Sequence, residues 1–301
     1  MTGTATTGYW LVLLAAVLWA LLGVFSTRLL GAGVPAFEIA FWRAALASPL
    51  FIVHAALLKK LRLAPRDAPA FTAFALVGVT LFYAALNLAI EAGGVSLAFV
   101  LLYTAPAFVA VLAAVFLGER LTPLKIALVL MSMLGVLLVT RGDGATASLT
   151  AVAWGLTAGA SYASYYLFGK WALRRYRPVT IFAYVMPLGA LGLLPLVEFD
   201  VLRVSSSAVW LDLALMGTLS TYLAYFVYYT GLRTVEASRA VLVATVEPLL
   251  AALLAALLFG ERLGVSGIIG GSLILATAII AGVRNAPRRS ASHATKLSKT
   301  P

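Results

Sequence analysis

The sequence predicts an all-α integral membrane protein of ten spanning helices, arranged as two five-helix repeats of opposite orientation. Three observations predict this fold. The first is composition, because 62% of the 301 residues are hydrophobic and only 11% are charged, against about 25% charged residues in soluble domains. The second is a row of ten apolar segments that are each long enough to cross a bilayer. The third is an internal repeat with an offset of 142 residues.

The ten segments contain few charges and are separated by short polar or Pro/Gly turns. Long apolar runs of this kind are typical of membrane helices and not of the alternating strands of a barrel. The first segment lacks a basic leader and a cleavage site, so we expect it to be retained as a helix. We expect the helices at residues 9–30, 35–58, 69–90, 95–117, 123–141, 149–171, 179–198, 208–231, 237–259 and 264–284.

Lys and Arg residues are distributed unevenly over the connections between these segments. If the N-terminus is cytoplasmic, 17 of them fall on the cytoplasmic side and four on the opposite side. This positive-inside bias predicts that both termini are cytoplasmic, in a multi-pass protein of a bacterial cytoplasmic (inner) membrane. The net charge of +11 then faces anionic lipid headgroups, and no nucleic-acid partner is expected. The polar, basic tail at residues 285–301 is expected to be disordered and cytoplasmic.

The internal repeat aligns residues 96–121 with residues 238–263 without a gap. Eleven of the 26 aligned positions are identical, including the run Gly-Glu-Arg-Leu at 118–121 and 260–263. Five predicted helices lie within the offset, so the two copies have opposite orientations. We therefore expect one repeat at 9–142 and an inverted one at 149–284, an arrangement that many secondary transporters use for alternating access. Pro106 and Pro248 occupy equivalent positions in the two copies and are predicted hinges.

Three motifs carry a resemblance to a known family. They are Phe41-Trp42-Arg43 in the second helix, the Gly-Glu-Arg-Leu run in each repeat, and the Glu247-Pro248 pair in the ninth helix. Over residues 9–284 the chain resembles ten-helix members of the drug/metabolite transporter superfamily, of the EamA type. Among these it is most similar to bacterial amino-acid exporters, including the aromatic branch. It departs from a symmetric pattern where Ala105 stands opposite Glu247.

Two ionisable residues are predicted to lie deep in the membrane, where each costs at least about 2.5–3.5 kcal/mol. Glu247 either binds a substrate ammonium or carries a coupling proton, or it satisfies a backbone carbonyl freed by Pro248. Arg43 either receives a substrate carboxylate or braces facing helices, with Glu38 as a partial counter-charge. Both alternatives stay open for each residue.

Tyrosine and asparagine side chains at similar depth form the remaining candidate site. Their i,i+4 spacing places each pair on one helix face, and together they are suited to a central cavity for amphipathic organic solutes. The alternative is an aromatic belt at the membrane interface. The predicted substrate-binding residues, besides Arg43 and Glu247, are Tyr83, Asn87, Tyr103, Tyr162, Tyr166, Tyr225 and Tyr229.

The resemblance implies a secondary transporter that exports amino acids, with aromatic and other neutral ones as candidates, or related small metabolites. An exporter of another solute class, such as a drug, a nucleotide sugar or another metabolite, is the alternative. A membrane-embedded enzyme is the remote one, since the helices contain no cluster of catalytic carboxylates. With no cysteine and two histidines, we expect no metal site and no cofactor. The expected partners are a small-molecule solute and the lipid bilayer, and the expected state is a monomer or a weak homodimer.

Overall fold

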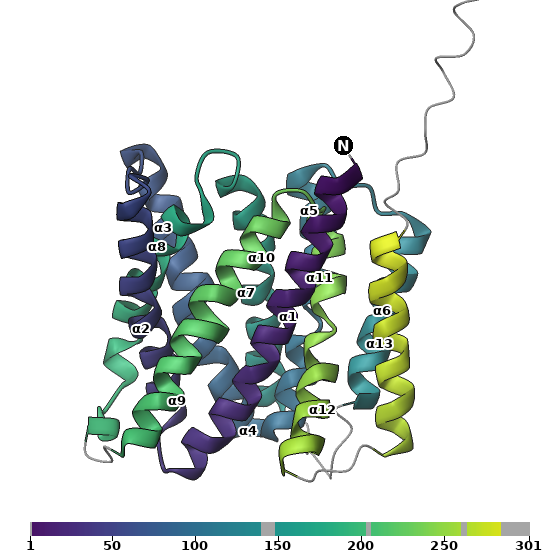
Figure 1. Ribbon diagram of the computed structural model, residues 1–301. Helices are drawn as coiled ribbons and strands as arrows, with labels where there is room; N and C mark the ends of the chain where they lie inside the picture. The colour runs from purple at the N-terminus through teal and green to yellow at the C-terminus, as the bar shows by residue number, and fades with distance from the viewer. Residues whose placement is uncertain (1, 140–147, 203–205, 260–263, 284–301) are drawn as a thin grey trace, which may run out of the picture.

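The computed structural model describes residues 2–139, 148–202, 206–259 and 264–283. These residues form a bundle of roughly parallel and antiparallel helices (Figure 1) and contain no strand. The prediction of an all-α membrane protein with ten helices is confirmed, although several of the ten are built from more than one segment. The tail at 285–301 and the second Gly-Glu-Arg-Leu run at 260–263 lie outside the described residues.

The first half of the chain contains four long segments and several shorter ones. They are α1 (Thr2–Gly31), α2 (Ala36–Leu57), the 3-10 turn η1 (Pro65–Asp67), α3 (Ala68–Phe74), the π-helical segment η2 (Ala75–Leu81), α4 (Phe82–Leu102), α5 (Ala105–Leu117) and α6 (Pro123–Val139).

The second half has the same kinds of segment. They are α7 (Leu149–Ala172), α8 (Pro178–Leu193), the 3-10 turns η3 (Leu194–Leu196) and η4 (Asp200–Leu202), α9 (Ser207–Gly217), the π-helical segment η5 (Thr218–Leu223), α10 (Ala224–Leu232), α11 (Ala237–Ala244), α12 (Glu247–Phe259) and α13 (Val265–Val283).

Hydropathy and length agree with a multi-pass membrane protein. Five described helical stretches are long and apolar enough to span a bilayer: Thr6–Gly31, Ala36–Leu57, Pro65–Ala89, Pro178–Leu196 and Ser207–Leu232. Three shorter apolar helices accompany them, at Ala105–Leu117, Pro123–Leu138 and Val265–Ala281. Large hydrophobic side chains such as Trp10, Phe116 and Leu257 are more than 60% exposed, as expected where lipid covers the outer surface.

Two predicted helices are broken near their middle. The fourth is interrupted between α4 and α5, and the ninth between α11 and α12, with Pro106 and Pro248 each in the first turn after the break. A proline is tolerated there because the first turn of a helix has no internal acceptor for its N–H groups. The prolines therefore begin new helices and do not kink continuous ones.

The third and eighth predicted helices each contain a π-helical stretch, η2 and η5. Such wider turns leave backbone carbonyls free for other partners and are frequent at functional sites. In η5, the Thr221 hydroxyl donates to the carbonyl of Met216, 3.1 Å away.

The helices pair across the two halves of the chain. α4 packs on α7, α2 on α8 and α6 on α13, while α1 packs on α10 and α12. Small residues allow the closest of these approaches: a Cβ added to Gly189 of α8 would lie 2.5 Å from Val79 of η2. The largest of three buried hydrophobic clusters is rich in alanines and aromatic side chains and runs between the halves.

Charged residues join helix ends on both faces of the bundle. We call the face on which α1 begins the N-terminal face (top in Figure 1). On it, Arg175 lies 3.1 Å from Asp67, whose other oxygen accepts from Tyr176 at 2.6 Å. On the opposite face, Arg28 lies 3.1 Å from Asp212.

Glu38 is not a counter-charge for Arg43, so that expectation is wrong. Its carboxylate accepts the backbone N–H groups of Asp200 and Val201 at the start of η4. These N–H groups have no partner within their own helix turn, so the carboxylate satisfies them and ties α2 to the connection after α8.

Candidate functional site

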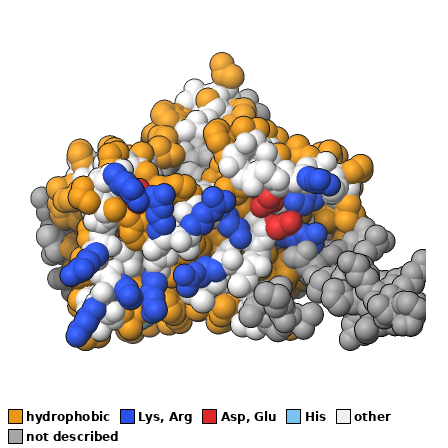
Figure 2. Space-filling view, turned by 90° about the horizontal axis from the view of Figure 1, so that it is seen from above, with side chains coloured by type: hydrophobic (Ala, Val, Ile, Leu, Met, Phe, Trp, Pro, Cys, Tyr) orange, Lys and Arg blue, Asp and Glu red, His pale blue; other side chains and the backbone are white. Residues whose placement is uncertain are grey.

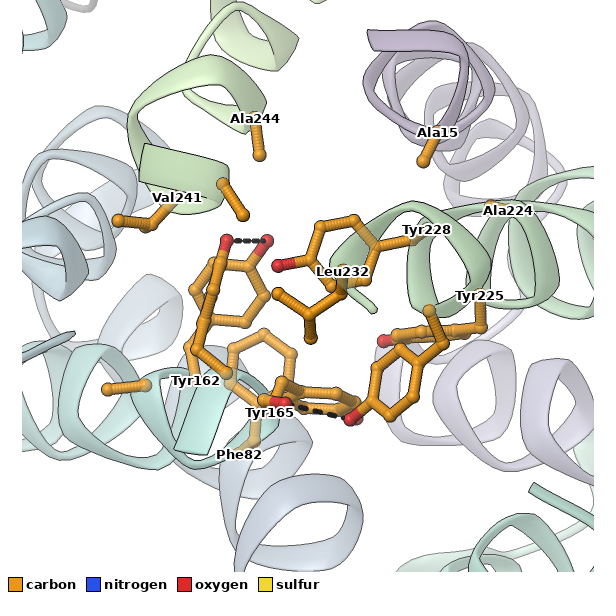
Figure 3. Packing of buried hydrophobic residues seen from close by; sticks show 14 of the residues in the cluster. Ala15, Phe82, Tyr162, Tyr165, Ala224, Tyr225, Tyr228, Leu232, Val241 and Ala244 are labelled. Carbon is orange, nitrogen blue, oxygen red and sulfur yellow. Dashed lines mark hydrogen bonds between the residues drawn. The ribbon is translucent and has the colours of Figure 1, made fainter. Parts of the chain in front are cut away.

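The candidate site is a cluster of tyrosines around one arginine and one glutamate in the middle of the bundle. Its residues come from α2, α4, α7, α10 and the breaks at α5 and α12, so both halves of the chain contribute. Figure 3 shows Tyr162 and Tyr165 of α7 facing Tyr225 and Tyr228 of α10, beside Val241 and Ala244 of α11. All four tyrosines are at most 9% exposed.

Arg43 supplies the positive charge of the cluster. Its Nε donates to the Thr221 hydroxyl at 3.0 Å, which ties α2 to η5. Its guanidinium carbon lies 4.8 Å from the centroid of the Tyr83 ring, a cation–π distance. One of the five N–H donors of the arginine is thus bound to Thr221, and the face of the guanidinium lies over the Tyr83 ring. Arg43 therefore has both a bracing contact and capacity for a ligand.

Glu247 supplies the negative charge and is the first residue of α12. The Tyr103 hydroxyl is a hydrogen-bond partner of its carboxyl group, so the two helix breaks meet here. Glu247 and Arg43 are also close enough to interact through their charges. The arrangement places a carboxyl and a guanidinium group in one aromatic cluster.

The tyrosines of α7 and α10 pack ring against ring. The Tyr166 hydroxyl donates to the Tyr162 hydroxyl at 3.5 Å, which brings the predicted i,i+4 pair together. Tyr225 stacks on Tyr165, with ring centroids 5.3 Å apart and planes 12° apart. Tyr229 points elsewhere, because its hydroxyl donates to the backbone carbonyl of Tyr165 at 2.8 Å and so holds α10 against α7.

Several buried polar atoms of this cluster lack a hydrogen-bond partner among the described residues. They include the hydroxyl of Ser220 and the indole nitrogen of Trp19, whereas the hydroxyls of Tyr83 and Tyr165 interact with Tyr225 and that of Tyr228 with Tyr166. An unsatisfied buried polar group costs about 1–3 kcal/mol, so native proteins rarely leave such groups without water or a ligand. A polar solute bound in the cluster would supply partners for such atoms.

Asn87 is placed differently from the other predicted site residues. Its side-chain amide donates to the backbone carbonyl of Tyr83, four residues earlier in α4, at 3.0 Å. This local bond occupies one of its two donor hydrogens. The structure therefore gives Asn87 a contact within its own helix and leaves its part in ligand binding a prediction.

Tyr165, Tyr228 and Trp19 also belong to the cluster, although they were not predicted from the sequence. Tyr165 and Tyr228 lie three residues after Tyr162 and Tyr225, a spacing that also places side chains on one helix face. Trp19 of α1 packs edge-on against Tyr225, with ring centroids 5.3 Å apart. The i,i+3 spacing was a signal for the first two, and the tertiary packing of α1 on α10 was needed for the third.

Comparison with protein-family models gives one match that covers nearly the whole chain. The EamA-like transporter family model matches residues 6–141 and again residues 149–283. The two matched stretches correspond to the two halves described above.

Individual relatives agree with that match. An uncharacterized transporter of Archaeoglobus fulgidus is 29% identical over 238 residues, which is 79% of this chain and 85% of the relative. A protein of Streptantibioticus cattleyicolor named "Probable terminal-alkyne amino-acid exporter" is 29% identical over 93% of this chain and 95% of its own length. A crystal structure with a TM-score of 0.77 shares the fold at 17% identity and covers 91% of this chain and 96% of its own.

Proposed function

The chain belongs to the EamA-like transporter family, and from this premise we propose that it is a secondary transporter that exports amino acids or related small metabolites by alternating access. The observation that carries the proposal is the pairing of Arg43 and Glu247 within one buried tyrosine cluster. An amino acid carries a carboxylate and an ammonium group a few ångströms apart, and the cluster offers the complementary charges.

The guanidinium of Arg43 is suited to the substrate carboxylate, because it presents its donors in a planar fork that matches two oxygens. Glu247 is suited to the ammonium, with the Tyr103 hydroxyl as a second acceptor. The tyrosine hydroxyls and the aromatic faces around them are suited to a side chain with some apolar area. Among such side chains, aromatic and other neutral ones fit the composition of the cluster.

The charge pattern of the cluster argues against a nucleotide sugar. Two phosphates require several cations, whereas Arg43 is the cation that lies within this cluster. The name of the Streptantibioticus cattleyicolor relative supports an amino acid. We therefore favour a zwitterionic or neutral solute, and a transporter over a membrane enzyme.

Structural correspondence between the halves supports an inverted repeat. The helix breaks at Pro106 and Pro248 are 142 residues apart, and the π-helical segments begin at Ala75 and Thr218. The cross-half pairs also correspond, because α2 with α8 and α6 with α13 each join a helix to its predicted counterpart. Two such halves that rock about the central cluster would expose it to one membrane face at a time.

Surface charge supports a cytoplasmic N-terminal face. Seen from above in Figure 2, this face carries many Lys and Arg side chains and few acidic ones. By the positive-inside rule, this charge distribution supports the proposal of cytoplasmic termini and of a bundle in a bacterial inner membrane.

A counterflow experiment tests the solute class. Purified protein in liposomes preloaded with one unlabelled amino acid should accumulate the same labelled amino acid. We expect exchange for neutral and aromatic amino acids, and weak exchange for their amides, which lack the carboxylate, and for their N-acetyl derivatives, which lack the ammonium. Exchange of drugs or sugar nucleotides with no exchange of any amino acid would overturn the proposal.

A further inference from the structure

A second cluster of charged residues joins α5 to α11 at the N-terminal face. Glu119, which follows α5, accepts the backbone N–H of Ala237 at 2.8 Å and of Ser238 at 3.4 Å, and also the Ser238 hydroxyl. Its carboxylate lies 3.2 Å from the ammonium of Lys125 in α6. We call Glu119, Lys125, Glu236, Ser238 and Arg239 the Glu119 cluster.

The cluster is extended by Glu236 and Arg239. Lys125 lies 3.2 Å from Glu236, and Arg239 lies 3.0 Å from the same carboxylate. Burial alone would raise the pKa of Glu236, but the charges of Lys125 and Arg239 hold this pKa below its ordinary value. Arg239 also donates to the carbonyl of Ala281 at 3.2 Å, which attaches the end of α13. Four helices, α5, α6, α11 and α13, thus meet at one group of charges.

The local sequence explains how Glu119 reaches α11. Gly118 ends α5 with φ +70°, a left-handed conformation that glycine adopts without strain. The chain therefore turns sharply, and the next side chain points at the first turn of α11. The N–H groups of that turn have no acceptor within α11, and a carboxylate there also favours the positive end of the helix dipole.

Packing differs between the two faces along the same pair of broken helices. On the N-terminal face, α11 packs on α5 and also on α7. On the opposite face, the repeat makes α4 and α12 the counterparts of α11 and α5. It likewise makes α4 and α1 the counterparts of α11 and α7. Among the described residues neither pair has comparable packing. The two broken helices are therefore packed together at the N-terminal end.

We propose that the Glu119 cluster is the latch of the N-terminal entrance to the central site, and that this latch is closed in the structure. Opening this entrance requires α11 to leave α5, and Glu119 must then release Ala237 and Ser238. The latch depends on alternating access and not on the identity of the solute.

The ion pairs at the other helix ends occur on both faces. Arg175–Asp67 on the N-terminal face and Arg28–Asp212 on the opposite face are formed in the same structure. These two pairs therefore do not alternate with each other. The Arg175–Asp67 pair joins the end of α7 to the start of α3, and the Arg28–Asp212 pair joins α1 to α9. We expect each of these two pairs of helices to move as a unit.

The natural absence of cysteine allows a direct test with a single reporter thiol. Ala244 ends α11, is 2% exposed and lies beside the tyrosine cluster (Figure 3). The variant Ala244→Cys is labelled with a membrane-impermeant maleimide in inside-out and in right-side-out vesicles, without added solute. Glu119→Ala is then introduced, with Ser238→Ala as a milder second variant and Asp67→Ala as a matched control.

We expect Glu119→Ala to speed labelling from the N-terminal face about tenfold and to slow labelling from the opposite face, because loss of hydrogen bonds to a charged group shifts a two-state equilibrium by about this factor. Ser238→Ala should act in the same direction, and Asp67→Ala should leave both rates near those of the parent. Unchanged rates in both latch variants, or faster labelling from both faces, would overturn the latch. Since no solute is present, a wrong solute class cannot produce either outcome.

Discussion

The guanidinium of Arg43 lies 4.8 Å from the centre of the Tyr83 ring, while its Nε donates to Thr221. Because Tyr83 of α4 and Thr221 of η5 both contact the side chain of Arg43, the remaining donors of its guanidinium have a fixed direction. A fixed, planar fork recognises a carboxylate better than a flexible ammonium group does. The contact between α2 and α4 is therefore the basis of our first prediction.

Arg43→Lys should weaken amino-acid exchange about tenfold or more, which corresponds to about 1.4 kcal/mol of lost binding. The measurement is the concentration dependence of counterflow in liposomes for an amino acid and for its amide. Because the amide has no carboxylate, its weak exchange should change little. An equal loss for both solutes would mean that Arg43 only braces the helices.

Glu247→Gln should abolish the response of transport to a pH gradient, because glutamine keeps a polar contact with Tyr103 but cannot release a proton. Uptake is measured in proteoliposomes with and without an imposed gradient, and Tyr103→Phe serves as the control that removes the contact and keeps the carboxyl. If the gradient drives the Glu247→Gln variant as it drives the parent, the coupling proton is not carried by Glu247.

The two end-of-helix ion pairs should differ in their contribution to stability. Asp67 accepts bonds from Arg175 and from Tyr176, whereas one oxygen of Asp212 has no partner among the described residues. Both arginines are half-exposed, so solvent screening reduces the contribution of each ion pair to the free energy of unfolding. We expect Asp67→Asn to lower the free energy of unfolding by about 1–2 kcal/mol and Asp212→Asn by less than about 1 kcal/mol.

Thermal unfolding of both variants in one detergent measures this difference. Each aspartate is buried and each substitution preserves its size, so the variants are matched in everything except their hydrogen bonds. Equal melting temperatures for the two variants would contradict the assignment.

Gly159 should be intolerant of even a methyl group. A Cβ at this position would lie 2.9 Å from the carbonyl oxygen of Leu101 and 2.9 Å from the Thr104 hydroxyl, at the break between α4 and α5. The first neighbour is backbone, and the second is a hydroxyl that donates to that same carbonyl at 2.6 Å, so Gly159→Ala should cost about 1–3 kcal/mol of stability. Gly23→Ala is the control, because its Cβ would meet Ala251 at an ordinary 3.9 Å. It should be neutral or slightly stabilising in the same unfolding assay.

Local pattern was enough to predict the number of helices and the two charged residues of the site. Apolar segment length predicts spanning helices, and a lone Arg43 or Glu247 within such a segment stands out without any tertiary information. The i,i+4 rule also paired Tyr162 with Tyr166 correctly. What these features share is that they depend on residues close together in the chain.

The remaining features depend on residues far apart in the sequence. Glu38 was expected near Arg43 but binds N–H groups more than 160 residues away, a pairing set by how α2 meets the connection after α8. The π-helical segments carry no distinctive residue pattern, since a single extra residue in a turn changes the backbone and not the composition. Glu119 was recognised as part of a repeat, but its contact with α11 required the structure.

The helix breaks at Pro106 and Pro248 give the last prediction. A helix continuing through either position would need an N–H at the proline, and proline has none. Alanine restores this donor, so Pro248→Ala should allow α11 and α12 to join, with a gain of about 0.5–1.5 kcal/mol from the new hydrogen bond. A straight helix would be favoured in one state of the transport cycle over the other. We therefore expect slower turnover, by up to about tenfold, with solute affinity nearly unchanged.

Pro106→Ala should act alike at the break between α4 and α5, whereas Pro187→Ala, within the continuous helix α8, should not slow turnover. Exchange rates at saturating solute measure the effect, and parent-like turnover in both break variants would show that the prolines begin helices without acting as hinges.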